Sequence, residues 1–279
     1  MKYIIHGATG AQGKPLFDAL TKTGQRPLAA VRHQDAIDAG QGIAVDLASV
    51  DSLTNAYTGA DGVFVHLPLG SDDDRLAYAN NIAEAIDKAQ PKRVVISTSG
   101  WKLGTEGDTS ALPTLIKKVT ATDVPTAIVA PKLYLENLLL PIVIESVTKE
   151  GLLPYPLRAD YPVSWCSHLD IADVAAHLLQ DSSITGLIEV GMLPAITGQE
   201  LAAAFSEHFG KTVHFDALSP SEFGDRLATL FGREAADEVV SSYEAKAKTS
   251  DSAIHSEHSA QTILGLQPRS VTQWLADIA

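Results

Sequence analysis

The sequence predicts an α/β protein with a doubly wound parallel sheet, and three observations support this fold class. Short apolar segments alternate with amphipathic helical segments through residues 1–131. A glycine-rich turn directly follows the first apolar segment, and the regular alternation stops after Pro131. Strand–helix alternation at this spacing is typical of a parallel sheet with helices on both faces and right-handed crossovers.

Each element of the first part is predicted from its own pattern. Apolar runs predict strands, and apolar positions at helical spacing predict helices. We predict strands over 2–6, 27–31, 43–45, 62–67, 93–98 and 126–130. We predict helices over 13–23, 51–58, 73–89 and 110–122. The acidic residues 72–74 are expected to begin the third of these helices, because negative side chains stabilise a helix N-terminus.

The second part has a more mixed pattern. We predict helices over 133–147, 170–179, 197–209, 219–231 and 234–246, and strands over 163–166, 187–190 and 212–215. The segment 151–156 is interpreted as a break, since it contains Gly and two Pro residues. Thr197 and Glu200 form a capping-box pattern. A mobile polar loop is expected over 249–259.

The glycine-rich turn has the spacing Gly-x-x-Gly-x-x-Gly. Gly7 would make a tight turn, Gly10 would let the backbone approach a pyrophosphate, and Gly13 would allow the helix to pack on the strand. The N–H groups at the start of that helix would point at the phosphates. The strand–turn–helix setting therefore favours a Rossmann-type dinucleotide site. The remaining residues of the loop, expected to contact the cofactor with the glycines, are Thr9, Ala11 and Gln12.

Other candidate residues gather where predicted strands end, because ligands bind beyond the carboxyl ends of parallel strands. These candidates are Arg32, His66, Leu67, Pro68, Ser97 and Pro131. Two interpretations of His66 stay open, a packed histidine or a contact to the nicotinamide. We expect residues 1–131 to form the nucleotide-binding domain. Residues 132–279 would form a smaller substrate-side lobe that shares elements with the main sheet.

The end of the second strand indicates which nucleotide is preferred. NAD-preferring proteins place an acid about 20 residues past the glycines, whereas an Arg there accommodates the 2′-phosphate of NADP. No acid lies between Thr21 and Val31, Arg32 follows, and the first acid is Asp35. The pattern favours NADP(H) over NAD(H), with a solvated loop charge as the alternative for Arg32.

Composition excludes several other classes. The net charge of −13 argues against nucleic-acid binding, which needs a basic surface. No apolar run reaches the ~20 residues of a membrane span, and no leader pattern precedes the first strand, so a cytoplasmic protein is expected. Cys166 is the only cysteine and is interpreted as a buried thiol. His255 and His258 lack a metal-like ligand set, and no metal site is expected.

Several further segments accompany the glycine motif, namely Gly42–Leu47, Val124–Pro131, Tyr134–Asn137, Asp170–Ala175 and Leu264–Ser270. Together with that motif they resemble the NmrA-like, atypical short-chain dehydrogenase/reductase family over most of the chain, with similarity to its quinone-reductase and triphenylmethane-reductase branch. The resemblance implies that Asp46 and Leu47 flank the adenine.

One departure from the typical dehydrogenases bears on chemistry. They use a Tyr-x-x-x-Lys pair on one helix face, where the Lys lowers the tyrosine pKa and binds the ribose. No tyrosine of this chain has a lysine four residues later. In the comparison Lys117 stands at the family's Lys position, and Pro113 stands where the tyrosine would be. The resemblance implies that Lys117 orients the cofactor, with a solvated surface lysine as the alternative.

Two functions follow as hypotheses. The first is an NADPH-dependent reductase that passes a hydride to a quinone-like or other conjugated electrophile, which needs little acid assistance. The second is an NmrA-type redox sensor that binds NADP(H) without turnover. Tyr134 and Trp165 would line the substrate cleft or pack as buried aromatics. The sequence is compatible with a homodimer.

Overall fold

The computed structural model describes residues 1–32, 40–101 and 103–278, so Asp35 lies outside the described residues. The chain divides into two compact units. Unit 1 comprises Met1–Pro131 and His168–Glu189, and unit 2 comprises Lys132–Ser167 and Val190–Ala279.

Unit 1 is built on a sheet with the strand order β10-β6-β5-β4-β1-β2-β3. The pairs from β3 to β6 are all parallel, which confirms the predicted α/β, doubly wound fold class. The order reverses between β1 and β4, and ligands of such sheets bind at this switch point. The strands are β1 Lys2–His6, β2 Arg26–Val31, β3 Gly42–Ala44, β4 Gly62–Val65, β5 Val94–Ser97, β6 Thr126–Pro131 and β10 Gly186–Val190.

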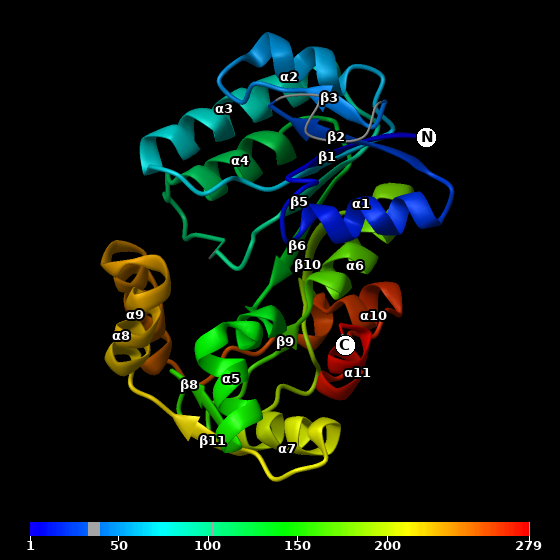
Figure 1. Ribbon diagram of the computed structural model, residues 1–279. Helices are drawn as coiled ribbons and strands as arrows, with labels where there is room; N and C mark the ends of the chain where they lie inside the picture. The colour runs from blue at the N-terminus through cyan, green and yellow to red at the C-terminus, as the bar shows by residue number, and fades with distance from the viewer. Residues whose placement is uncertain (33–39, 102, 279) are drawn as a thin grey trace. The chain divides into compact units, whose positions relative to one another are not determined.

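Helices cover both faces of this sheet (Figure 1). Helices α2, α3 and α4 pack against one another on one face, and α1 packs against α6 on the other. The strands are mostly apolar, and the central strands β4 and β5 are fully buried because helices cover both faces of the sheet. The helices are α1 Gly13–Lys22, α2 Val50–Tyr57, α3 Asp72–Ala89, α4 Ala111–Thr120 and α6 His168–Gln180. Helix α3 begins at the predicted acidic residues, and Ser71 is its cap.

Unit 2 surrounds a separate core that includes Trp165, Tyr155, Phe205 and Trp274. Its strands are β7 Leu133–Tyr134, β8 Leu152–Tyr155, β9 Trp165–Cys166 and β11 His214–Ala217. Its helices are η2 Leu135–Leu139, α5 Pro141–Glu150, α7 Gly198–Phe209, α8 Pro220–Phe231, α9 Arg233–Ala247, η3 Ser256–His258, α10 Ala260–Leu264 and α11 Val271–Asp277.

One prediction for unit 2 is wrong. The segment 133–147 is not one helix, because a strand and a 3-10 turn precede α5, which starts at Pro141. Proline has no N–H to donate, so it is suited to a first helical turn and unsuited to the interior of a longer helix. The predicted break after this helix is confirmed, because α5 ends at Glu150 and Gly151 has a left-handed backbone conformation. Strand β8, which lies within the same segment and pairs with β11, was not predicted. The capping box of Thr197 and Glu200 is confirmed.

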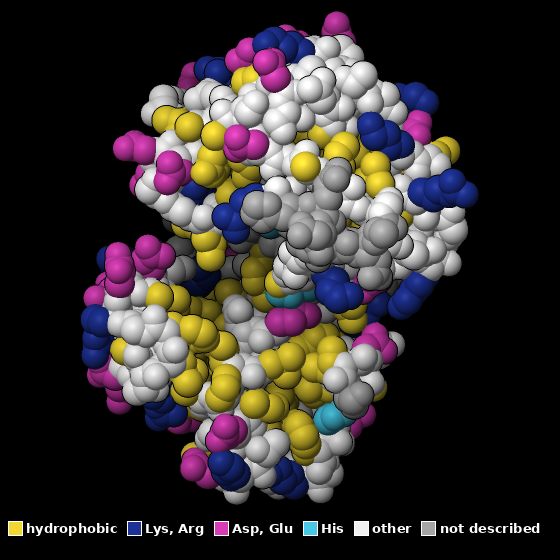
Figure 2. All heavy atoms as spheres, turned by 45° about the horizontal axis from the view of Figure 1, so that its top comes forward, with side chains coloured by type: hydrophobic (Ala, Val, Ile, Leu, Met, Phe, Trp, Pro, Cys, Tyr) yellow, Lys and Arg dark blue, Asp and Glu magenta, His cyan; other side chains and the backbone are white. Residues whose placement is uncertain are grey.

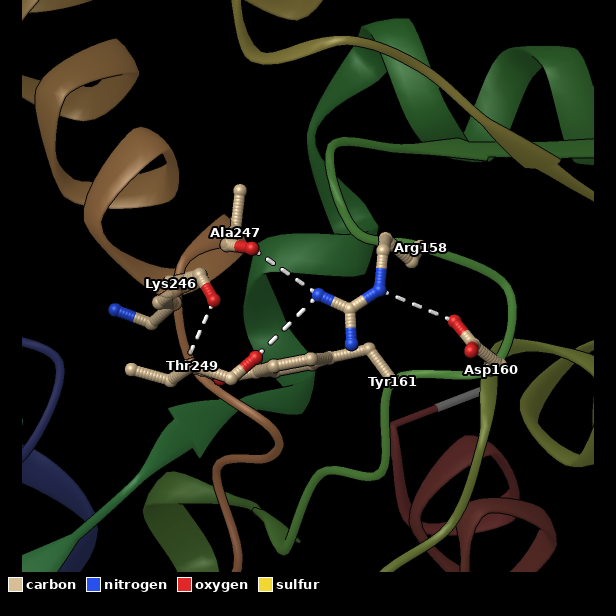
Figure 3. A network of polar contacts seen from close by, with 6 residues as sticks. All are labelled: Arg158, Asp160, Tyr161, Lys246, Ala247 and Thr249. Carbon is tan, nitrogen blue, oxygen red and sulfur yellow. Dashed lines mark hydrogen bonds and ion pairs between the residues drawn. The ribbon is translucent and has the colours of Figure 1, made fainter.

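A polar network holds the loop after β8 to the end of α9 (Figure 3). The Arg158 guanidinium donates to the carbonyl oxygens of Ala247 and Thr249, pairs with Asp160, and lies 5.2 Å from the Tyr161 ring centroid. Tyr161 in turn bonds Thr249 and the Asp251 carbonyl. The expected polar loop over 249–259 is therefore tied to the core of unit 2 at its start.

Candidate nucleotide site

The glycine loop has the geometry of a phosphate cradle. Gly7 has a φ of +62°, and its carbonyl accepts from the Gly10 N–H at 2.8 Å. A Cβ on Gly13 would lie 2.2 Å from the Gly7 oxygen, so α1 packs directly on the turn. A Cβ on Gly10 would meet only that oxygen, at 3.3 Å. Residues 9–11 are exposed. The predicted turn at Gly7 and close packing at Gly13 are both present.

His66 directly follows β4 and lies against the glycine loop at the switch point. A Cβ on Gly7 would lie 2.1 Å from His66 Nε2, so the imidazole packs on the bare glycine. The His66 pKa is lowered, because the effect of burial exceeds the opposing effect of a backbone hydrogen bond with Leu67. His66 Nε2 is buried and has no hydrogen-bond partner among the described residues. The ring is therefore neutral and packed against the loop, with one unused polar atom.

A second histidine, His6, ends β1 beside the same turn. Its Nε2 lies 2.8 Å from the Tyr57 hydroxyl of α2. Burial, and secondarily the nearby His66, lower the His6 pKa to about 3, and burial raises the Tyr57 pKa. Both groups are thus neutral near pH 7. Their hydrogen bond supports the end of β1 next to the glycine loop, and neither group changes its charge near pH 7.

A side-chain clamp joins the glycine loop to the segment after β5. Ser97 Oγ donates to Gln12 Oε1 at 2.7 Å, and Gln12 Nε2 donates to Ser99 Oγ at 3.1 Å. Ser99 has a φ of +53°, an uncommon value for a residue with a side chain. Gln12 and Ser97 were predicted as cofactor contacts, and in the structure their side chains bind each other. Ser99 was not predicted as a cofactor contact, although it directly follows the strand predicted over 93–98.

Thr98, between the two serines of this segment, leaves a second unused polar atom. Its side chain is buried, and its Oγ1 has no hydrogen-bond partner among the described residues. A buried hydroxyl without a partner is costly, by about 1–3 kcal/mol. Because Thr98 lies at the ligand-binding edge of the sheet, a bound nucleotide would be one source of such a partner.

The adenine-side candidates lie at the ends of the neighbouring strands. Arg32 directly follows β2, is exposed, and makes no hydrogen bond or ion pair with any described residue. Asp46 follows β3 and accepts from the Ala48 N–H, while the Leu47 carbonyl accepts from Asn81 of α3. Leu67 is buried and Pro68 half-buried after β4, and Pro131 is buried at the end of β6. All of these lie at the carboxyl edge of the sheet.

Lys117 does not lie at that edge. It is exposed in the last turn of α4, six residues and about 9 Å along the axis from the helix start. Because α4 connects two parallel strands, its start is at the carboxyl edge and its end at the opposite edge. Its neighbour Lys118 donates to Asn80 of α3 at 2.6 Å. The role implied for Lys117 stays a prediction, and its placement argues against it.

Other candidates from the sequence lie in unit 2. Trp165 is part of the buried core, and the Cys166 thiol is buried near the Leu133 carbonyl. Burial, followed by Cys166 and Glu136, raises the Tyr134 pKa well above its ordinary value. No group of metal-binding side chains occurs among the described residues. Likewise, no helix within the described part of the chain is long and apolar enough to cross a membrane.

The residues at the switch point fit a bound dinucleotide. The Gly7–Gly13 turn leaves space that side chains would fill, and the first turn of α1 carries no acid. His66 Nε2 and Thr98 Oγ1 offer unused hydrogen-bonding atoms after β4 and β5. The sheet order, the glycine turn and this edge define a protein with a Rossmann fold.

The chain belongs to the NmrA-like family, whose model matches residues 2–275. The family resemblance found in the sequence is therefore confirmed.

Solved structures share the fold at low identity. A Citrobacter sp. triphenylmethane reductase complexed with NADP(H) has a TM-score of 0.80 and 18% identity, covering 99% of both chains. An NADPH-dependent quinone oxidoreductase from Escherichia coli, complexed with NADPH, has a TM-score of 0.75 and 18% identity, covering 100% of this chain and 99% of its own. A Staphylococcus aureus nucleoside-diphosphate-sugar epimerase has a TM-score of 0.79 and 17% identity, covering 99% of each chain.

Proposed function

We propose that the protein is an NADPH-dependent reductase that transfers a hydride to a quinone-like or other conjugated small molecule. The observation that carries the proposal is the glycine cradle at the β1/β4 switch point, flanked by the unused polar atoms of His66 and Thr98. The similar triphenylmethane and quinone reductases, solved with NADP(H) or NADPH, support this cofactor and this class of acceptor.

In this proposal the chain's own residues bind and orient. The Gly7–Gly13 turn and the N–H groups of α1 hold the pyrophosphate. Arg32 pairs with the 2′-phosphate, for which its guanidinium has no competing partner among the described residues. The Gln12–Ser97–Ser99 clamp fixes the loops after β1 and β5 relative to each other. Bound NADPH would supply the hydride.

The absence of a Tyr-x-x-x-Lys pair restricts the acceptor. Without this pair as a proton donor, the acceptor must stabilise the arriving negative charge itself. A quinone does so by spreading the charge over its π-system and then takes a proton from water. Orientation against the cofactor then supplies most of the rate enhancement.

The missing pair also favours a second function, an NADP(H) sensor without turnover. Two measurements separate the functions. Calorimetry with NADPH and NADH tests binding, and steady NADPH oxidation with a panel of quinones tests turnover. Tight NADPH binding with no oxidation of NADPH by any acceptor would establish the sensor.

Arg32→Asp tests the cofactor assignment. We expect NADPH affinity to fall by roughly 1.5–3 kcal/mol, through loss of a charge-assisted contact, while NADH affinity is kept or improved. Arg26→Asp, at the opposite end of β2 and also exposed, is the matched control and should leave both affinities unchanged. Equal binding of the two nucleotides by the unaltered protein would refute the NADP assignment.

A further inference from the structure

Arg75 and Trp101 form a stacked pair at the carboxyl edge of unit 1. Arg75 lies in the first turn of α3, and its guanidinium carbon is 4.3 Å from the Trp101 ring centroid. Trp101 lies on the segment after β5, and α3 follows the loop after β4. Because β4 and β5 are adjacent parallel strands, both segments leave the sheet at the edge where ligands bind.

The charge of Arg75 is only weakly compensated. The residue is 7% exposed, and its Nε is buried without a hydrogen-bond partner among the described residues. Its ion pair with Asp72 spans 3.9 Å, and the Asp72 carboxylate is fully exposed to water, which screens it. Asp73 and Asp74 are also exposed. Burial of a cation is unfavourable unless it gains a partner, so this guanidinium is suited to bind a further negative group.

The Trp101 ring presents a surface to solvent beside this cation. It is 51% exposed, whereas Trp165 and Trp274 are nearly completely buried. Leu69 of the loop after β4 and Leu103 of the segment after β5 are exposed as well. Exposed aromatic and apolar side chains at a ligand-binding edge indicate a contact surface for an apolar ring.

We propose that Trp101 stacks on the ring of the hydride acceptor and that Arg75 makes the site selective for planar acceptors that carry a negative charge. This inference rests on the proposed reductase function and names its substrate class. The guanidinium attracts an anionic ring across the indole and disfavours a cationic one. Anionic quinones are therefore favoured over neutral quinones, and both over cationic triphenylmethane dyes.

Steady-state kinetics test this order with three probes: a naphthoquinone sulfonate, the neutral quinone menadione, and the cationic dye crystal violet. We expect Arg75→Gln to raise the KM for the sulfonate about tenfold and to change the KM for menadione less than twofold. Trp101→Ala should raise the KM for both the sulfonate and menadione, and Trp101→Phe should restore the original KM for menadione. NADPH affinity should stay unchanged in each variant.

Arg158→Gln is the matched control, because Arg158 also stacks on an aromatic ring but lies in the network of Figure 3. It should leave all three KM values as they are. Parallel changes of the sulfonate and menadione KM values in Arg75→Gln would overturn the proposal, as would crystal violet being the preferred acceptor.

A binding measurement keeps this test independent of turnover. Trp101 is the one exposed tryptophan of the three, so quenching of tryptophan emission by the sulfonate, with NADP⁺ present, reports binding at this ring. Binding lost in Arg75→Gln supports the proposal even if the protein oxidises no NADPH, in which case only the reductase function fails. Equal binding in both proteins overturns the site while leaving the reductase function intact.

Discussion

Arg75 in unit 1 and Arg158 in unit 2 both stack on an aromatic ring, yet their N–H groups are used differently. Arg158 donates to two carbonyl oxygens and pairs with Asp160, all within its own unit. Arg75 has a distant ion pair with an exposed carboxylate and a buried Nε without a partner among the described residues. The first arginine stabilises a fold. The second holds a charge in place for a ligand.

Two pairs of polar side chains illustrate the same difference. Tyr155 and Tyr243 in unit 2 share a 2.6 Å hydrogen bond inside a ring cluster with Phe223. His66 Nε2 and Thr98 Oγ1, at strand ends of unit 1, are buried atoms without a hydrogen-bond partner in the described part of the chain. Figure 2 shows acidic and basic side chains interspersed over the face it draws, so surface charge there does not mark a site.

The largest effect is expected in the glycine loop of unit 1. Gly13→Ala places a Cβ against backbone oxygens at 2.2 Å and 2.7 Å, so the start of α1 must shift. We expect a loss of about 1–3 kcal/mol in unfolding free energy and of NADPH binding. Urea unfolding and calorimetry measure both. Gly10→Val should instead weaken NADPH binding with little unfolding, since its Cβ meets one atom only, at 3.3 Å.

Unchanged NADPH affinity in Gly13→Ala would show that the cradle does not need this close packing. Unchanged affinity in Gly10→Val would show that no pyrophosphate approaches Gly10. Gly10→Ala is the control and should resemble the unaltered protein in stability.

Tyr243→Phe tests the other side of the comparison. The variant leaves the Tyr155 hydroxyl with only a 3.4 Å contact from Asn137. We expect unfolding free energy to fall by about 1–2 kcal/mol, since a buried hydroxyl loses its partner, and NADPH affinity to stay unchanged. Tyr78→Phe on α3 is the control, because its hydroxyl has no hydrogen bond among the described residues. A change in NADPH affinity in Tyr243→Phe would contradict the expectation that this tyrosine pair in unit 2 affects stability alone.

Acid should destabilise the protein through His6. Its pKa is about 3 in the folded protein and 6.5 in the unfolded chain, so between these pH values the unfolded chain binds a proton that the folded protein does not bind. The stability present above pH 6.5 is lost as pH falls toward 3, by up to ~1.4 kcal/mol per pH unit. His66, whose pKa is also lowered, adds in the same direction.

Unfolding in urea across this pH range measures that slope. His6→Gln should reduce it, although the variant is less stable at neutral pH without the Tyr57 contact. His214→Gln, at an exposed position, should leave the slope unchanged. A slope in His6→Gln equal to that of the unaltered protein would mean that other groups cause the acid sensitivity.

Local patterns in the sequence account for much of this architecture. Alternating apolar segments predicted the strands of unit 1, and Gly7, Gly10 and Gly13 predicted the turn, because these features depend on neighbouring residues. The segment 133–147 was misjudged, since Pro141 was not taken as a helix start. The pairs Arg75–Trp101 and Gln12–Ser97 join residues far apart in the chain, so no local pattern reveals them. The one local signal for a role of Arg75 is its position as a basic residue directly after three acidic ones.

Lys117→Ala should have the smallest effect of all, and it tests the resemblance against the geometry. The family comparison gives this lysine the task of orienting the cofactor, whereas the structure exposes it in the last turn of α4. A charge at the amino edge of the sheet is remote from a ligand at the carboxyl edge, so we expect NADPH affinity and quinone turnover to change less than twofold, or about 0.4 kcal/mol. Lys118→Ala is an imperfect control, because that residue binds Asn80, and it should lower stability slightly without changing kinetics. Titration of the two variants with NADPH and their quinone turnover show whether Lys117 acts on the cofactor. If Lys117→Ala lowers affinity and turnover together while Lys118→Ala does not, the sequence-based role of Lys117 is correct and the edge argument fails.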